Sequence, residues 1–527
     1  MATLMRFMKN LRLFSLTFIL FLSLTACTST TPIPPTVVPS TNTVSAPLEP
    51  LTGNWIGAIT KPDGSTASIV IHLNETESIL NIEPMTRNWK LDLSQTNDNL
   101  KFSTTGSTLD PFKEISFVGA YSSEIFSGEI NWDGQTSKVT FTQIKTIDSS
   151  VLEKYEGVYR FESGRVLSII VSPSFSTGGV TFFSNSLMLT DFNSGAFRGL
   201  YPLTEDTFAI GALRVVGAPF EGQIQFVKND QGNVESLIWK DNSSAPEQLA
   251  SRVSIKYEDI TFTSADGTKL AGRLSMPDAA EVSPAIMMMH GSEPGTRDNV
   301  SNKVMMHFMV SQGFAILNYD KRGVGASEGK YVEAASPVNL QRHADDANAG
   351  VQFLLTRPEI DAQKIGLIGY SQAGWVIPLA VSQSQNISFF VILSGPVAST
   401  AHDSKFNAYT SGGNSSSAQY DDALITQQLR DFRPGGFDPL PVIAELDQKG
   451  LWLWGSVDKT VPATFCAENL KKIIDAGKDN FYYQILPNGD HGLNESQNGY
   501  FTEIPYSPRV LFYSALADWL EKYVLVP

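Results

Sequence analysis

The chain has 527 residues, of which 42% are hydrophobic, so it is long enough for several folded domains of about 100–200 residues each. Its formal net charge at pH 7 is −15. A net negative field repels phosphate backbones and anionic lipid surfaces, so nucleic acid and charge-driven membrane binding are excluded as expected partners. The composition therefore predicts two or three soluble domains.

The start of the chain has the organisation of an export signal. The first 27 residues begin with three basic side chains, continue with the apolar run Leu13–Leu24 and close with Leu-Thr-Ala-Cys. An apolar run of about 10–14 residues is shorter than a membrane-spanning helix needs, and preceding basic residues favour a signal peptide over an uncleaved anchor. The ending resembles a bacterial lipobox, which implies a lipoprotein signal peptide at 1–26 and a lipid anchor on Cys27.

Residues 27–50 are rich in Ser, Thr and Pro and almost uncharged. Such a segment cannot bury a core and stays extended, so we expect a tether between the membrane anchor and the folded part, which would lie in the bacterial cell envelope outside the cytoplasmic membrane. If Cys27 is lipidated, Cys466 has no partner, and we expect an exported protein without a disulfide. Cys466 is then an inert core thiol.

Residues 51–250 contain short segments of alternating polar and apolar residues divided by clusters of Gly, Asn, Asp and Ser. A period of two with frequent turns predicts antiparallel β structure. Two similar openings, Leu51–Gly57 and Tyr155–Tyr159, predict two barrel-like units at 51–148 and 149–250. The second unit resembles the lipocalin-like domains that accompany some bacterial serine esterases. We assign the units no chemistry and expect their four tryptophans in barrel cores.

The pattern of residues 251–527 changes to strands alternating with helices, which predicts an α/β domain with a mostly parallel sheet covered on both faces. A hairpin is expected about Asp266-Gly267. Further strands are predicted at 285–289, 314–319, 364–370, 391–394, 451–454 and 481–486, and helices at 300–312, 337–357, 372–382, 463–476 and 508–524. Residues 397–448 interrupt the alternation after the sixth strand, where an insertion is expected to form a lid over the active site.

Ser371 has the sequence context of a catalytic nucleophile. The apolar strand Ile365–Tyr370 runs directly into it, and small residues surround it. Small residues permit the sharp strand-to-helix turn that strains the serine backbone and exposes its hydroxyl. The motif Gly-x-Ser-x-Gly is altered by Ala373, where glycine is usual. A helix-capping serine is the alternative interpretation.

His491 and Asp458 complete a candidate triad. A serine hydroxyl needs a nearby base, and His491 follows the last predicted strand within Asn-Gly-Asp-His-Gly. Asp458 follows an earlier strand and would orient the imidazole. Asp490 is the rival, but adjacent side chains in an extended loop point apart. The chain order Ser, Asp, His is that of triads in the α/β-hydrolase fold.

The strand ending in Met289-His290-Gly291-Ser292 occupies the place where such folds position an oxyanion-hole N–H, so Ser292 and Gln372 are the expected donors. Together with the segment Asp320–Ser327, these motifs resemble bacterial α/β-hydrolase esterases related to dienelactone hydrolases and to the prolyl oligopeptidase catalytic domain. The resemblance covers about residues 254–525.

Several charged residues near these motifs receive structural interpretations. Relatives usually have glycine where Glu293 stands, and a buried carboxylate would repel an oxyanion, so Glu293 is expected to point to solvent. Ion pairs that hold loops are expected for Arg297, Asp298, Asp320 and Arg322. A solvated helix face, rather than a metal site, is expected for Asp345 and Asp346.

The function that the resemblance implies is hydrolysis of a small-molecule carboxylic ester through an acyl-enzyme on Ser371, with His491 as general base and Asp458 as the orienting acid, without cofactor or metal. A peptidase or acyl-peptide hydrolase is one alternative, although that family carries a bladed propeller that two small β units do not resemble. Acyl transfer to an alcohol or amine is another. A non-catalytic surface lipoprotein that binds glycans or lipids is the alternative from a different class.

Overall fold

The structure is a computed structural model of the chain. The residues that it describes are 51–62, 66–74, 77–82, 85–96, 98–108, 110, 112–122, 125–172, 175–177, 180–183, 186–213, 221–242, 245–414, 421–433, 435–500 and 509–526. The predicted signal peptide, the tether and the lipid-attachment residue Cys27 lie outside these residues. No helix within the described ranges is both long and apolar enough to cross a membrane.

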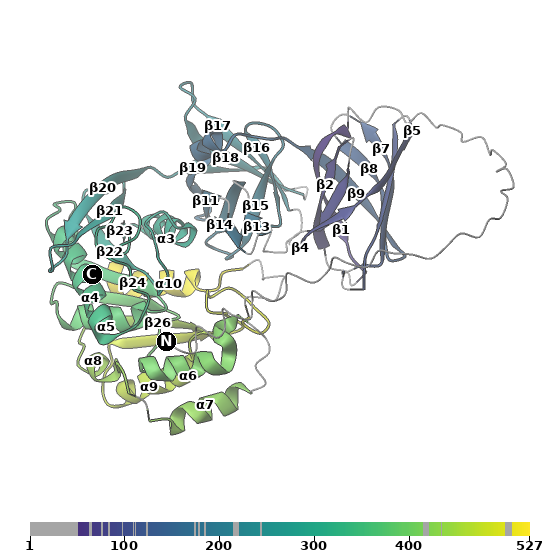
Figure 1. Cartoon of the computed structure of the whole chain (residues 1–527). Coiled ribbons are helices and arrows are strands. Elements are labelled where there is room, and N and C mark those ends of the chain that lie inside the picture. Colours follow the sequence, from purple (N-terminus) through teal and green to yellow (C-terminus); the bar gives the residue numbers. More distant parts are fainter. Residues whose placement is uncertain are drawn as a thin grey trace, which may run out of the picture. The chain divides into compact units, whose positions relative to one another are not determined.

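The first β unit is one antiparallel sheet with the strand order β4-β3-β2-β1-β9-β8-β7-β6-β5 (Figure 1). Its strands are β1 Gly53–Thr60, β2 Thr66–Leu73, β3 Ile79–Ile82, β4 Met85–Lys90, β5 Asp92–Thr96, β6 Asn99–Thr105, β7 Glu114–Ser122, β8 Ile125–Trp132 and β9 Gln135–Ile144. Alternating side chains meet in a single aromatic core, where the Phe126 ring centroid lies 4.7 Å from those of Trp55 and Phe141. The predicted barrel-like unit is confirmed.

The second β unit is a closed barrel, because β10 pairs with β11 on one side and with β19 on the other. The short helices α2 Ser149–Leu152 and η3 Glu153–Tyr155 precede it. Its strands are β10 Gly157–Phe161, β11 Val166–Ser172, β14 Ser186–Asp191, β15 Phe197–Pro202, β16 Thr207–Gly211, β17 Gly222–Lys228, β18 Val234–Asp241 and β19 Gln248–Arg252, and a separate ribbon is formed by β12 Phe175–Thr177 and β13 Val180–Phe183. The four tryptophans of the two units are buried in their cores, as expected.

The remaining strands form one eight-stranded sheet in the order β20-β21-β23-β22-β24-β25-β26-β27. Its strands are β20 Ile255–Thr263, β21 Lys269–Pro277, β22 Ser283–Met289, β23 Ala315–Tyr319, β24 Ile360–Tyr370, β25 Phe389–Leu393, β26 Lys449–Gly455 and β27 Phe481–Leu486. The first two strands are the predicted antiparallel hairpin, and β22 to β27 pair in parallel. The predicted α/β domain is confirmed.

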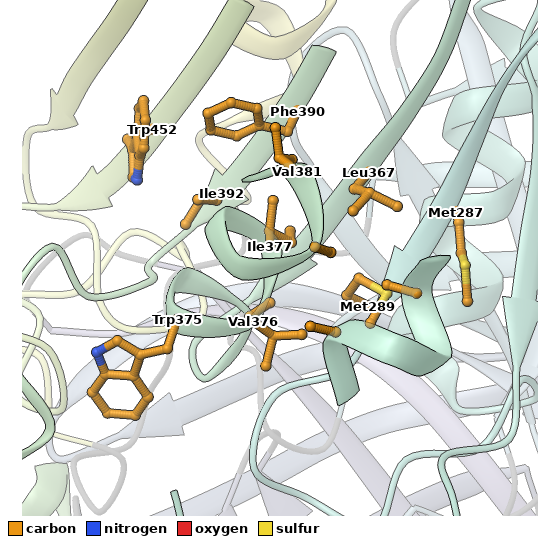
Figure 2. Close-up of a cluster of buried hydrophobic side chains, with 14 of the residues drawn as sticks. Met287, Met289, Leu367, Trp375, Val376, Ile377, Val381, Phe390, Ile392 and Trp452 are labelled. Atoms are coloured by element: carbon orange, nitrogen blue, oxygen red, sulfur yellow. The ribbon is translucent and has the colours of Figure 1, made fainter. Parts of the chain in front are cut away.

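Helices cover both faces of this sheet (Figure 1). They are α3 Val300–Ser311, α4 Pro337–Leu355, α5 Ala373–Ser382, α9 Ala463–Asp475 and α10 Tyr513–Leu520, followed by the π-helical turn η5 Glu521–Leu525. Successive residues of β22 point to opposite faces. Met287 and Met289 pack with α4 and α5 (Figure 2), whereas Met288 packs with α3 and α10. Burial on both faces explains why these strands are continuous apolar runs.

The predicted insertion between β25 and β26 contains α6 Thr400–Thr410, η4 Ser411–Gly413, α7 Asp422–Asp431 and α8 Leu440–Ala444. Two predicted boundaries are wrong, the first being the start of β24, which begins at Ile360 rather than at residue 364. The last helix begins at Tyr513 rather than at residue 508, because Arg509 and Val510 are extended and form isolated β-bridges, Val510 with Asn494. An apolar run alone does not distinguish an extended segment from the first turn of a helix.

Candidate active site

Ser371 lies in a strained turn between β24 and α5. Its φ is +53°, in the left-handed region that non-glycine residues rarely adopt. The turn is fixed because the Ser371 N–H donates to Leu393 O at 3.0 Å and the Gly374 N–H donates to Ser371 O at 2.8 Å. Neighbouring parallel strands thus hold the serine above the carboxyl end of the sheet, and its side chain lines two cavities.

Glycines make room for this turn and explain why Ala373 is accepted. A Cβ atom on Gly369 would lie 2.5 Å from the Ala373 Cβ and 2.8 Å from the Met289 Cβ. A Cβ atom on Gly374 would lie 2.6 Å from the Pro396 backbone nitrogen. The methyl group of Ala373 therefore occupies space that the bare Gly369 leaves open.

We expect Gly369→Ala to lower the free energy of unfolding by about 1–3 kcal/mol, the usual cost of overpacking a closed site. The measurement is the urea midpoint of the full chain, followed by tryptophan fluorescence. Gly435→Ala is the matched control, because a Cβ atom there would meet nothing within 4 Å. Equal midpoints for the two variants would contradict the packing argument.

His491 and Asp458 are brought together, 33 residues apart in the chain. His491 Nδ1 lies 2.9 Å from Asp458 Oδ2, and the other carboxylate oxygen of Asp458 accepts the backbone N–H groups of Thr460 at 2.7 Å and Val461 at 2.9 Å. The Asp458 side chain is fully buried. The rival Asp490 instead turns back on its own loop, where its carboxylate accepts the Asn494 N–H at 2.9 Å.

The charge of Asp458 sets the protonation of His491. Burial lowers the pKa of His491, but the Asp458 carboxylate and its hydrogen bond, together with the charges of Asp403 and Asp490, outweigh burial and raise the pKa above its ordinary value. The raised pKa makes the imidazole a stronger base, while the carboxylate fixes Nδ1 as the protonated nitrogen. Nε2 is then free to accept a proton.

The raised pKa predicts an acid limb in the rate of ester hydrolysis. Below this pKa the imidazolium cannot accept the serine proton, so kcat/KM should fall as the pH falls through a value above the ordinary histidine pKa. A pH–rate profile between about pH 5 and 8 measures this limb, because histidine side chains change charge in that interval. A flat profile over that interval would contradict the assignment of His491 as base.

Both predicted oxyanion donors lie close to Ser371. Ser292 lines the same two cavities as Ser371, and Gln372 lines one of them. Within the described ranges, neither the Ser292 N–H nor the Gln372 N–H donates to a protein acceptor. Two unsatisfied N–H groups next to a nucleophile are the arrangement that stabilises a developing oxyanion.

Glu293 is exposed, as expected, but its carboxylate also contacts its own loop. Its side chain is 51% exposed, but Oε1 accepts the Gly291 N–H at 3.2 Å and lies 3.9 Å from His290 Nδ1. The carboxylate therefore closes the loop before Ser292 and is partly hydrated there. This contact was not predictable because it depends on the turn that follows β22.

Two cavities meet at Ser371, with Ser292, Ser371 and Thr460 lining both. The first, of about 600 Å³, is lined by His491 and by apolar residues that include Val300, Met305, Phe512 and Tyr513; we call it the apolar cavity. The second, of about 840 Å³, is also lined by apolar residues such as Trp375 and Val461, but Thr400, Asp403 and Asn407 add polar groups to its wall; we call it the polar cavity.

Asp403, from the inserted helix α6, was not singled out by sequence. Burial raises its pKa to about 7, while the charge of His491 acts in the opposite direction. The helix is attached to the Asp458 loop, because Asn407 Nδ2 donates to Thr460 O at 2.9 Å and the Thr410 hydroxyl donates to Lys459 O at 2.6 Å. The insertion contributes a further carboxylate whose charge acts on His491, besides those of Asp458 and Asp490.

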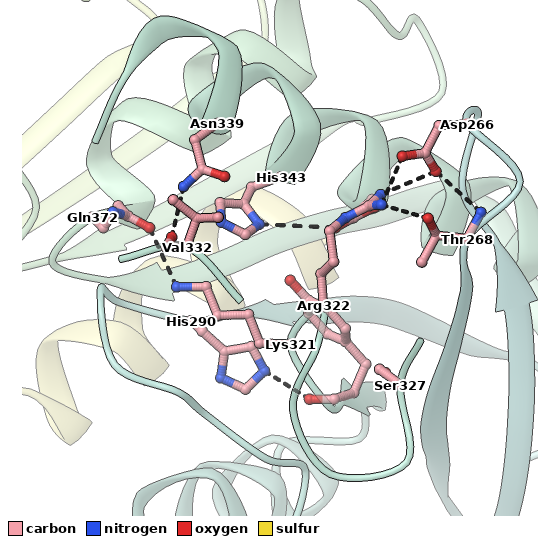
Figure 3. Close-up of polar contacts among 12 residues, drawn as sticks. Asp266, Thr268, His290, Lys321, Arg322, Ser327, Val332, Asn339, His343 and Gln372 are labelled. Atoms are coloured by element: carbon pink, nitrogen blue, oxygen red, sulfur yellow. Dashed lines mark hydrogen bonds and ion pairs between the residues drawn. The ribbon is translucent and has the colours of Figure 1, made fainter. Parts of the chain in front are cut away.

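The predicted loop-holding ion pairs are present. Arg297 lies 3.2 Å from Asp320, and Asp298 lies 2.7 Å from Arg273. Arg322 lies 2.7 Å from Asp266, on the hairpin turn (Figure 3).

The expectation of a solvated face is wrong for Asp346. Its side chain is fully buried and receives two hydrogen bonds from Arg322, whereas the neighbouring Asp345 is half-buried and accepts a hydrogen bond from Gln341 at 2.8 Å. No group of three or more His, Cys, Asp or Glu side chains in the described ranges is arranged to hold a metal ion. Cys466 is a buried free thiol whose pKa is raised by burial, as expected of an inert core residue.

The eight-stranded sheet and the serine in a strained strand-to-helix turn define an α/β-hydrolase domain. Residues 300–506 match the prolyl oligopeptidase family, Peptidase_S9. The chain is 31% identical over 122 residues to thiohydrolase AneE of Aspergillus aculeatus, covering 22% of this chain and 35% of that protein. It is 25% identical over 166 residues to esterase EstD of Thermotoga maritima, covering 29% and 37%.

The chain spans less than half the length of these two curated relatives. Among solved structures, the Pyrococcus furiosus esterase Pf2001 is 18% identical and has a TM-score of 0.37, with 51% of this chain and 92% of that chain covered.

Proposed function

We propose that the chain is a serine esterase that cleaves small-molecule carboxylic esters through an acyl-enzyme. Ser371 is the nucleophile, His491 the general base and Asp458 the orienting acid. The observation that carries the proposal is the 2.9 Å contact between His491 and the buried Asp458, made by a histidine that lines the same cavity as the strained Ser371. The sequence similarity to thiohydrolase AneE and to esterase EstD supports the proposal.

The chemistry follows from the positions of these groups. The Ser371 hydroxyl attacks the ester carbonyl carbon while His491 Nε2 takes its proton, and the carbonyl oxygen becomes an oxyanion that the N–H groups of Ser292 and Gln372 bind. The intermediate collapses, the C–O bond to the alcohol breaks, and the proton on His491 leaves with the alcohol. Water then repeats the sequence on the acyl-enzyme and releases the acid.

The two cavities favour a substrate with two unlike ends. Apolar side chains of the apolar cavity suit a hydrocarbon or aromatic group, whereas Asp403, Asn407 and the hydroxyl groups of the polar cavity suit a group that forms hydrogen bonds. Because both cavities adjoin Ser371, an ester bond between such groups would lie at the nucleophile.

The test is labelling of the full chain by a fluorophosphonate probe, together with turnover of p-nitrophenyl esters of short and long acyl chains and of a peptide p-nitroanilide. We expect labelling and ester turnover that disappear in Ser371→Ala. Faster turnover of the anilide would favour a peptidase, and an ester product formed with an added alcohol would favour acyl transfer. A folded wild-type protein without labelling would overturn the proposal and favour the non-catalytic binding lipoprotein.

We further propose that Cys27 carries a lipid that anchors the protein to the membrane of a bacterial cell envelope. The support is the sequence of the first 27 residues alone. Metabolic labelling with a radioactive fatty acid should mark the wild type and not Cys27→Ser, and the variant should leave the membrane fraction. Equal labelling of both proteins would contradict the anchor.

A further inference from the structure

Lys321 is a buried cation directly behind the oxyanion loop. It follows β23, its residue is 1% exposed, and its Nζ donates to Gly291 O at 2.6 Å, to Gln372 Oε1 at 3.3 Å and to Glu293 O at 3.4 Å. Figure 3 shows the Lys321 ammonium and the Gln372 side chain facing each other. In the part of the chain that the structure describes, no carboxylate forms an ion pair with this ammonium. Its charge is therefore held by neutral oxygens.

We propose that Lys321 is the positioning residue of the oxyanion hole, which holds both backbone N–H donors, Ser292 and Gln372, in the orientation that the oxyanion needs. The inference rests on the proposed esterase function. Lys321 does not touch the substrate in this arrangement but acts through the two loops that it connects.

Lys321 orients the first donor, the Ser292 N–H, through the peptide unit that joins Gly291 to Ser292. The Gly291 carbonyl and the Ser292 N–H belong to the same planar trans peptide, so they point in opposite directions. Because Lys321 Nζ binds the carbonyl at 2.6 Å, the N–H is directed away from Lys321. A cation on the carbonyl also polarises the peptide and strengthens its N–H as a donor. Rotation of this peptide would break the contact with a buried charge, which makes rotation costly.

The second donor is held through its own side chain. The amide of Gln372 is fixed at both ends, because its oxygen accepts from Lys321 at 3.3 Å and its Nε2 donates to Glu333 O at 3.3 Å. Gln372 is 3% exposed and directly follows the nucleophile. One ammonium thus connects the loop after β22 to the turn after β24, the two segments that supply the donors.

The charge of Lys321 also favours the oxyanion and makes this effect depend on pH. Burial lowers the pKa of Lys321 to about 8, although the carboxylates of Glu293 and Glu333 act in the opposite direction. Its remaining titratable neighbours are His290, His343 and Tyr331.

Burial lowers the pKa of both histidines and raises that of Tyr331, so these three groups do not change charge near pH 8. As the pH rises through about 8, Lys321 becomes neutral and the rate should fall.

The test compares Lys321→Met with the wild type in hydrolysis of a p-nitrophenyl ester. We expect kcat to fall by about 10²–10³-fold with little change in KM, the effect of losing an oxyanion donor, and the alkaline limb near pH 8 to disappear. Lys321→Arg, which keeps the charge, should restore part of kcat and move that limb to higher pH. Lys364→Met is the matched control, because that ammonium also caps a backbone carbonyl, Leu525 O at 3.4 Å, and should leave kcat unchanged.

A second measurement needs no variant. A trifluoromethyl ketone adds to a serine hydroxyl and presents an oxyanion, so its affinity for the wild type should fall above about pH 8 while KM for the ester stays constant. If the wild type hydrolyses esters but Lys321→Met keeps its kcat, or the affinity for the ketone is constant through pH 8, the role of Lys321 is overturned and the esterase function stands. A folded wild type without turnover would overturn both.

Discussion

Replacing Asp458 by asparagine should lower kcat for ester hydrolysis by about 10⁴-fold with little loss of folded protein. Asp458 uses one oxygen to accept the N–H groups of Thr460 and Val461 and the other to accept from His491 Nδ1. An asparagine would keep its carbonyl oxygen on the two backbone donors and turn its NH₂ group toward the imidazole. Nδ1 would then have to accept, Nε2 would carry the proton, and the histidine could not take the proton of Ser371.

The matched control is Asp490→Asn. Asp490 is adjacent to His491 and also buried, but its carboxylate accepts from the loop backbone at Asn494. This variant should cost some stability and keep kcat within about tenfold, the effect of one lost hydrogen bond. Steady-state kinetics of the two variants with the same ester make the measurement. A large loss of kcat in Asp490→Asn and a small loss in Asp458→Asn would show that Asp490, and not Asp458, is the triad acid.

Replacing Arg322 by methionine should lower the free energy of unfolding by about 3–5 kcal/mol, the cost of leaving a buried charge without its partner. The Arg322 guanidinium donates from two nitrogens to the carboxylate of Asp346, whose side chain is fully buried in α4. It also lies 2.7 Å from Asp266, on the turn between β20 and β21. Without Arg322, the charge of Asp346 would have His343 as its neighbour at 3.8 Å, and burial lowers the pKa of that histidine, which keeps it neutral.

Urea unfolding, followed by the residual rate of ester hydrolysis, measures this loss in the hydrolase domain. Arg430→Met is the control, because Arg430 and Glu468 form an exposed pair in which the side chains are 44% and 34% accessible. Exposed pairs contribute about 0–1 kcal/mol, so this variant should stay close to the wild type. A loss of equal size in the two variants would show that burial of Asp346 is not the cause.

The hydrolase fold could be predicted from the sequence because its strands and turns have recognisable local sequence patterns. Strands buried on both faces, such as β24 and β25, are continuous apolar runs, and the small residues around Ser371 mark a tight turn. Asp266-Gly267 marks the turn of the sheet hairpin, and Ser336 marks the start of α4, where its side chain accepts the Asn339 N–H. The start of α10 was wrong because Val510 pairs with Asn494, a contact between segments far from any local signal.

The sequence indicates candidate residues for the site but not the contacts that hold them. Ser371, Asp458 and His491 could be singled out because each lies in the turn or loop that follows a strand. The buried partner of Asp346, the return of Glu293 to Gly291 and the three acceptors of Lys321 depend on atoms that only the tertiary structure brings together. A lysine within a polar loop motif looks solvated in sequence, although here its ammonium is enclosed.

Helix α6 is attached to the loop that carries Asp458, through Asn407 on Thr460 O and Thr410 on Lys459 O. A displacement of this helix would therefore pull on the acid that orients His491. Under the proposed function, the inserted segment therefore supports the catalytic acid in addition to lining the polar cavity. Exchange of the insertion for one from another hydrolase would alter the turnover number together with the choice of ester, unless the replacement supplies equivalents of these two anchoring side chains.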